Sequence, residues 1–360
     1  MSQPSSSAPL PATAPAMPEG PLSGPAAWRG AELARSAAWI HHLSIENVAE
    51  LEAAAARQNA RPLATLRREH FALPQLASAL DAIRRELLGG RGFVVVRGLP
   101  LERYTLAEAA TIFWGLGTHL GTALSQNAQG HVLGHVKDLG YRADDPHTRL
   151  YQTNQRQGYH TDSADIVGLL CIRPARSGGR SSLASTVTAY NEVLARRPDL
   201  LPMLFEPVAT DHRGEVPPGS RPWFSIPVLS WYAGQLSGIY QRRYIESAQR
   251  FADAPRLTAR QREALDVFDA VLDDPAVHLE MDFLPGDIQF SHNHQILHDR
   301  TAFEDDTDPH RRRHLLRLWL SPADGRPLPP VFAERYGTVE PGRRGGVKSA
   351  DGVLRSPLDV

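Results

Sequence analysis

The 360-residue chain is poor in cysteine, in long apolar runs and in net charge. Its single cysteine, Cys171, excludes an intrachain disulfide and suits a reducing cytoplasm. The longest apolar runs, at 92–96 and 166–172, are far shorter than the ~20 residues that a membrane-spanning helix needs. The 39 basic and 40 acidic side chains nearly cancel, which argues against binding to nucleic-acid phosphates or to an anionic membrane surface. We therefore expect a cytoplasmic protein.

Composition divides the chain into a central part and two tails. Residues 1–26 hold seven prolines, five serines and five alanines but one charged side chain, Glu19, so we expect a disordered tail there. Glycine and proline beyond Arg343 predict a loose C-terminal tail over 343–360. No linker or repeat interrupts residues 27–342, which predicts a single domain. The oligomeric state stays open, and a homo-oligomer is compatible with the sequence.

Local patterns predict helices early in the chain and strands late. Apolar periodicity, capping residues and terminal glycines predict helices over 44–57, 74–88, 105–116 and 258–273. Runs of β-branched or alternating apolar residues predict strands over 92–98, 278–283, 288–293 and 313–321. This order favours a mainly β fold with flanking helices, built on a double-stranded β-helix (a jelly-roll, cupin-like core), over alternating βαβ units.

The triplet His160-Thr161-Asp162 is the first candidate site. Residues i and i+2 of an extended chain point to the same side, so one imidazole and one carboxylate can reach the same metal ion. Such a triplet also arises by chance, and then it is a hydrogen-bonded pair on a surface strand. The triplet alone does not choose between these alternatives.

A third ligand candidate, His298, lies 136 residues after Asp162, behind a predicted strand and turn. Two histidines and one carboxylate that leave part of a metal's coordination sphere open are typical of non-haem Fe(II) oxygenases. With no thiolate in the motif, a structural zinc site of the cysteine type is disfavoured. His292 and His294 form an H-x-H pair that offers alternative ligands.

The predicted strand 313–321 carries Arg313 and Arg317 on one face, together with Leu315 and Trp319. Its apolar content predicts burial, and buried arginines need anionic partners. Two interpretations remain open. The arginines form structural salt bridges, or Arg313 holds the far carboxylate of a dicarboxylate in a bidentate fork.

Several motifs occur together in an order and spacing that resemble one known family. They are H-T-D at 160–162, the pair Gly178-Gly179 followed by Ser181, Asn293 five residues before His298, and R-x-x-x-R at 313–317. Together they resemble the Fe(II)/2-oxoglutarate-dependent dioxygenases of the taurine and chlorophenoxyacetate type, the TauD/TfdA family. The resemblance covers roughly residues 92–322.

This resemblance implies a cofactor, a co-substrate and a reaction. His160, Asp162 and His298 would hold Fe(II), and Arg313 and Ser181 would bind 2-oxoglutarate. The family couples O2-dependent decarboxylation of 2-oxoglutarate, to succinate and CO2, with oxidation of a small-molecule substrate. Halogenating relatives replace the carboxylate ligand with a small residue, so Asp162 favours hydroxylation, or desaturation or cleavage derived from it.

The substrate region departs from the family pattern. Members often carry Trp-Asp-Asn before the distal histidine, whereas this chain has Ser291-His292-Asn293. We take as substrate-binding candidates a set of polar and partly cationic residues: Asn154, Arg156, Asn293 and Arg317, with Tyr151, Gln152 and His294 nearby. Their character predicts a small substrate that carries a carboxylate, a sulfonate or a similar anion.

Two rival classes of function also fit the motifs. One is a metal-dependent cupin that is not an oxygenase, using His160 and Asp162 with His292 or His294. The other is a non-catalytic binding protein on the same scaffold, because a fold alone does not fix a function.

Overall fold

Two facing β-sheets form the centre of the computed structural model, which describes residues 16–58, 61–142, 148–216 and 219–359. The larger sheet has the strand order β1-β2-β14-β6-β17-β3, and β4 also pairs with β17. Its strands are β1 (Ile40–His42), β2 (Phe93–Arg97), β3 (Thr122–Ala123), β4 (Leu133–Val136), β6 (Ile166–Arg173), β14 (Ile288–His292) and β17 (His314–Ser321). The smaller sheet has the order β13-β8-β15-β5, from β13 (Leu279–Met281), β8 (Ser181–Ser185), β15 (Ile296–Arg300) and β5 (Gln157–His160).

Alternation along the strands creates two apolar layers on the larger sheet. On β2, Phe93 and Val95 point inward and pack with Leu183 of β8 and Ile296 of β15, so this core lies between the sheets. Val94 and Val96 point outward, into a second core formed with the helices. Side chains that alternate between two buried faces explain why β2 contains a nearly continuous apolar run.

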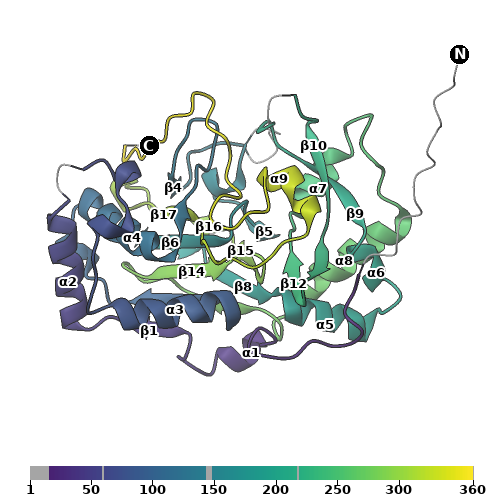
Figure 1. Cartoon of the computed structure of the whole chain (residues 1–360), viewed down its shortest axis with the longest axis horizontal. Helices are drawn as coiled ribbons and strands as arrows, with labels where there is room; N and C mark the ends of the chain where they lie inside the picture. The colour runs from purple at the N-terminus through teal and green to yellow at the C-terminus, as the bar shows by residue number, and fades with distance from the viewer. Residues whose placement is uncertain (1–15, 59–60, 143–147, 217–218, 360) are drawn as a thin grey trace, which may run out of the picture.

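Helices cover both outer faces and complete a four-layer arrangement (Figure 1). The larger sheet is covered by α2 (Ile45–Ala56), α3 (Ala77–Gly89) and α4 (Leu106–Leu120). The smaller sheet is covered by α5 (Thr186–Arg196), α6 (Leu201–Leu204) and α8 (Ala259–Leu272). The predicted jelly-roll core with flanking helices is confirmed.

The remaining elements are short. Three two-stranded pairs are β7 (Ser177–Gly178) with β16 (Phe303–Glu304), β9 (Pro207–Asp211) with β10 (Trp223–Pro227), and β11 (Leu229–Tyr232) with β12 (Gln235–Gly238). The short helices are α1 (Gly30–Leu33), α7 (Arg242–Ala248) and α9 (Ala333–Tyr336), with 3₁₀ turns at Leu63–Thr65, Arg68–His70, Leu101–Arg103, Leu150–Gln152, Pro309–Arg311 and Pro330–Phe332. Among the described residues, none of the helices combines the length and apolarity needed to cross a bilayer.

Helix starts follow the capping residues that the sequence displays. The Thr105 side chain accepts a hydrogen bond from the Glu108 backbone N–H, and Thr258 does the same for Gln261, which gives a complete capping box at α4 and at α8. Both predicted starts are confirmed. α4 ends at Leu120, four residues beyond the predicted end, because its apolar face continues against Leu318 and Leu320 of β17.

The predicted N-terminal tail is only partly tested, since residues 1–15 lie outside the described residues. For residues 16–26 the prediction of disorder is wrong. The Leu22 backbone N–H donates to the Asn191 side chain at 2.8 Å, and the Asn191 amide donates back to the Leu22 carbonyl at 2.7 Å. Tyr190 donates to the Gly20 carbonyl at 3.0 Å. These bonds use backbone groups of the segment, which its composition does not reveal.

The prediction of a loose tail over 343–360 is also wrong for the described residues. Arg344 is completely buried, and its guanidinium contacts the carboxylate of Asp165 at 2.8 Å. The next two residues, Gly345 and Gly346, have φ values of +91° and +73°. A side chain at Gly345 would lie within 2.7 Å of the Ser163 carbonyl, so glycine here permits close packing rather than mobility.

Replacement of Arg344 by methionine tests this anchor. The change leaves Asp165 as an uncompensated buried charge, so we expect the free energy of unfolding to fall by about 3–5 kcal/mol. Urea denaturation followed by circular dichroism measures the loss. The matched control is Arg343→Met, because the neighbouring Arg343 side chain is 74% exposed and pairs only with Glu340. Equal stability of the two variants would contradict the anchoring role.

Candidate active site

Pairing between β5 and β15 brings the two candidate histidines together. His160 and His298 are directly opposed in the register, and their ring centroids are 4.1 Å apart. Asp162 follows β5 in the chain, with its carboxylate oxygens 3.9 Å from Nε2 of His160 and 4.0 Å from Nε2 of His298. One ligand atom from each residue lies within 4.8 Å of the others, so the three side chains can hold one metal ion.

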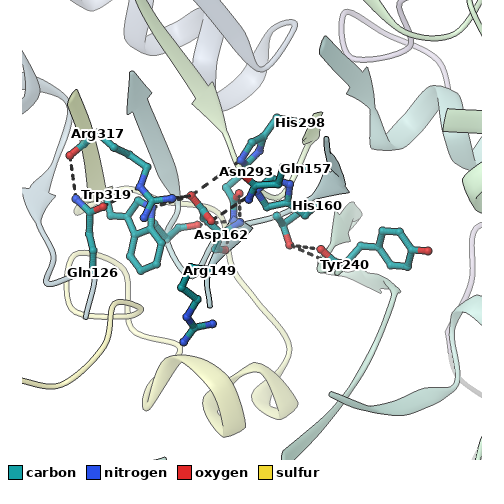
Figure 2. A network of polar contacts seen from close by, with 12 residues as sticks. Gln126, Arg149, Gln157, His160, Asp162, Tyr240, Asn293, His298, Arg317 and Trp319 are labelled. Atoms are coloured by element: carbon teal, nitrogen blue, oxygen red, sulfur yellow. Dashed lines mark hydrogen bonds and ion pairs between the residues drawn. The ribbon is translucent and has the colours of Figure 1, made fainter. Parts of the chain in front are cut away.

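Hydrogen bonds on two sides fix the turn that carries Asp162. Asn293 accepts from the Asp162 backbone N–H at 2.8 Å, and its amide donates to the carbonyls of Asp162 and Ala164 (Figure 2). On the other side, the Thr161 backbone N–H donates to the Tyr240 carbonyl, and the Thr161 hydroxyl accepts from the Tyr240 N–H. The middle residue of the triplet and the asparagine before His298 therefore position the acid.

Two side chains of β17 hold the carboxylate of Asp162. Trp319 donates its indole N–H to Oδ2 at 2.8 Å, and Arg317 approaches the same oxygen at 3.2 Å (Figure 2). Burial by itself raises the pKa of Asp162, but Arg317 and the two imidazoles outweigh burial and lower this pKa to about 2. Asp162 is therefore an anion throughout the physiological pH range.

The imidazoles of His160 and His298 are held in the neutral form, which is the form that binds a metal ion. Burial lowers the pKa of His298 to about 3, and it lowers the pKa of His160 as well. Nδ1 of His160 lies 2.9 Å from the Gly158 carbonyl, which fixes the proton on Nδ1 and leaves the lone pair on Nε2. The Gln157 side chain contacts that nitrogen at 2.8 Å, so a metal ion would displace this contact.

A narrow cavity extends from His160 and His298 to Arg313. Ser181, Leu169 and Leu315 also line it. The Arg313 guanidinium is buried, and its Nη1 has no hydrogen-bond partner among the described residues. Burial lowers the pKa of Arg313 to about 10, so the group is still a cation at neutral pH. An unpaired buried cation beside a serine hydroxyl fits the far carboxylate of 2-oxoglutarate.

A second cavity opens beside Asp162 and is rich in arginine. Its lining includes His160, Tyr244, Glu215 and the four arginines at positions 149, 243, 317 and 335. Glu215 forms ion pairs with two of these arginines, with Arg149 at 2.7 Å and with Arg335 at 3.7 Å. Figure 2 shows Arg149 on the opposite side of Asp162 from His298. Positive charge exceeds negative charge along this wall.

The structure separates the predicted substrate residues. Arg317 lines both cavities, as does Tyr151, whose ring lies under the Arg317 guanidinium. Asn154 is exposed, and its carbonyl accepts from the Phe303 backbone N–H. Arg156 pairs with Asp273 and Asp299 at 2.5 and 2.8 Å, away from both cavities.

The remaining candidates are structural. Asn293 is completely buried and bonds only to backbone groups of the turn. His294 contacts Asp165 at 2.8 Å, within the buried cluster that Arg344 completes. His292 is also completely buried. Among the described residues, the three-ligand cluster contains His298 and neither member of the H-x-H pair.

Sequence reasoning missed several residues of the site. Trp319 could have been found, because its position two residues after Arg317 places it on the same face of the strand. Gln157 could also have been considered, because it lies only three residues before His160 in the sequence. Nothing in the sequence around Arg149 or Arg335 indicates that they belong to the site. Arg149 precedes a 3₁₀ turn and Arg335 lies in α9, and only tertiary packing brings them to the cavity.

Loss of the indole N–H should weaken metal binding although Trp319 is not a ligand. Trp319→Phe keeps an aromatic ring but removes the hydrogen bond that orients Asp162, so we expect Fe(II) affinity to fall about 10–100-fold. Anaerobic Fe(II) titration measures the affinity. The control is Trp223→Phe, because Trp223 is buried in β10 and its indole nitrogen has no partner among the described residues. Similar affinities in both variants would rule out this role.

Comparison with known proteins agrees with the geometry. A family model described as taurine catabolism dioxygenase TauD, TfdA family matches residues 59–319. FR-33289 synthase of Streptomyces rubellomurinus is 34% identical over 320 residues, which cover 86% of this chain and 93% of the relative. Taurine hydroxylase-like protein SAT17 of Stachybotrys chartarum is 32% identical over 311 residues, covering 83% and 79%.

Solved structures support the same fold. Asparagine oxygenase, in complex with Fe(II), a hydroxyasparagine and succinate, aligns with a TM-score of 0.61 at 20% identity and covers 78% of this chain and 93% of that one. The non-heme iron oxygenase OrfP, in complex with Fe and α-ketoglutaric acid, aligns with a TM-score of 0.58 at 16% identity, covering 78% and 93%. The chain therefore belongs to the TauD/TfdA family, and it is a non-haem iron dioxygenase that uses Fe(II), 2-oxoglutarate and O2.

Proposed function

We propose that this dioxygenase hydroxylates a small anionic compound, or desaturates or cleaves it by way of hydroxylation, with release of succinate and CO2. The observation that carries the proposal is one continuous arrangement. The buried cluster of His160, Asp162 and His298 adjoins a cavity that ends at the unpaired guanidinium of Arg313. Cytoplasmic reducing conditions suit the single buried thiol of Cys171.

Different residues bind the metal, the co-substrate and the substrate. His160, Asp162 and His298 hold the iron, and Trp319 keeps the acid oriented toward it. Arg313 and Ser181 bind the far carboxylate of 2-oxoglutarate. When bound, iron and 2-oxoglutarate would activate O2, which supplies the oxidising power that protein side chains lack. The chain itself contributes orientation and a cavity whose apolar walls at Leu169 and Leu315 limit the access of water.

An anionic substrate is favoured by the arginine-rich second cavity. Arg149 and Arg335 share the single carboxylate of Glu215, so their combined positive charge is only partly compensated. A substrate anion in this cavity would complete the compensation while its carbon skeleton lies beside Asp162. Relatives of the chain include a taurine hydroxylase-like protein and a uridine-5'-phosphate dioxygenase, whose names contain a sulfonate and a phosphate compound.

The co-substrate complex gives a direct test that needs no substrate. An anaerobic mixture of protein, Fe(II) and 2-oxoglutarate should develop the weak visible charge-transfer band of a chelated complex. His160→Ala and Asp162→Ala should abolish the band, because each removes one of three ligands. His292→Ala serves as the control, since His292 lies outside the ligand cluster. A band that survives in both ligand variants would overturn the site assignment.

Substrate charge is tested with matched pairs of acids and their neutral amides. Succinate release should be stimulated by acids, and Arg335→Gln should raise the KM for them about 10–100-fold through loss of a charge-assisted hydrogen bond. Arg221→Gln is the control, because Arg221 is 55% exposed and stacks on Trp223 outside both cavities. Stimulation by amides alone would exclude an anionic substrate.

A further inference from the structure

Arg300 enters the co-substrate cavity from a strand that also carries a metal-ligand candidate. It lies two residues after His298 on β15, so both side chains point to the same side of the smaller sheet. Asp299, between them, points to the other side and pairs with Arg156. Arg300 is directly opposite Ser181 in the register with β8, and it lines the same cavity as Ser181 and Arg313.

Two guanidinium groups therefore converge on one end of this cavity. The Arg300 guanidinium lies 4.7 Å from the ring centroid of Phe303, and that of Arg313 lies 5.2 Å from the same centroid. Both side chains are almost completely buried, with 6% and 4% of their surfaces exposed.

The hydrogen-bonding capacity of the two groups is largely unused. Nη2 of Arg300 donates to the Gln155 carbonyl, but Nε and Nη1 are buried without a partner among the described residues. Nη1 of Arg313 is likewise buried without a partner among the described residues. The backbone N–H of Arg313 donates to Asp305, and this contact does not involve the guanidinium group.

Among the described residues, no carboxylate forms an ion pair with either guanidinium, although Asp138, Asp299 and Asp305 are near enough to Arg300 to interact electrostatically. The carboxylate of Asp299 accepts from Arg156. Asp305 accepts the backbone N–H of Arg313 rather than a guanidinium N–H, and burial raises the pKa of its carboxyl. Two adjacent buried cations repel each other and lose their hydration, and only a buried anion with several acceptor oxygens offsets both costs.

We propose that Arg300 is a second binding residue for the distal carboxylate of 2-oxoglutarate, which it and Arg313 contact together beside Ser181. The inference rests on the proposed role of Arg313. It assigns to Arg300 the selection of 2-oxo dicarboxylates over 2-oxo acids with an uncharged tail. The bond to the Gln155 carbonyl orients the guanidinium toward the cavity.

Binding of two 2-oxo acids separates this role from a structural one. 2-Oxovalerate has the same chelating end as 2-oxoglutarate and a similar chain but lacks the distal carboxylate. Anaerobic titration of the Fe(II) protein, followed by the visible band and by calorimetry, gives the dissociation constant of each acid. Arg300→Met should weaken 2-oxoglutarate binding about 10–100-fold and change 2-oxovalerate binding little, because only the former loses a charge-assisted bond.

Two further variants make the result decisive. Arg300→Lys keeps the charge and should recover part of the 2-oxoglutarate affinity, and it replaces Arg300→Met if the latter fails to fold. Arg312→Met is the matched control, since Arg312 adjoins Arg313 in sequence but is exposed. An equal loss for both acids, or unchanged 2-oxoglutarate affinity, would overturn the role of Arg300. A native protein that binds neither acid would instead overturn the proposed function and this inference with it.

Discussion

Antiparallel pairing between β5 and β15 is the constraint on which the whole site depends. It sets His160 opposite His298, and a shift of one residue in this register would turn one imidazole to the other side of the sheet. Asn293 and the backbone of Tyr240 then fix the turn that presents Asp162. The geometry of the three candidate ligands is thus held by backbone pairing and by an amide.

Four buried arginines differ in whether the chain pairs their guanidinium groups with an acid. Arg344 contacts Asp165 and Arg317 contacts Asp162, so each is neutralised locally and supports the architecture around the turn. Arg300 and Arg313 retain buried donors without partners among the described residues. An unpaired buried charge is costly, and Arg300 and Arg313 line one cavity in which a bound anion would offset that cost.

The three ligand candidates lie at the boundary between two cavities of different character. The cavity that ends at Arg313 combines apolar side chains such as Leu169 and Leu315 with charged ones. The second cavity, beside Asp162, is lined by arginines from distant parts of the chain. Tyr151, Gln157 and Arg317 line both cavities, as does His160.

Local sequence patterns were enough to predict where helices begin, which side chains share a face of a strand, and which residue types could bind a metal. Capping residues fixed where α4 and α8 begin, alternation placed Arg313, Arg317 and Trp319 on one face of β17, and the motif spacing singled out His298. Tertiary structure alone decided what those side chains contact. The Asn293 side chain bonds to backbone groups, and Arg156 pairs with acidic side chains. Arg344 is buried in the core, although it lies in the segment expected to be a loose tail. Periodicity is a local property, whereas the partner of a polar group depends on chain segments more than a hundred residues away.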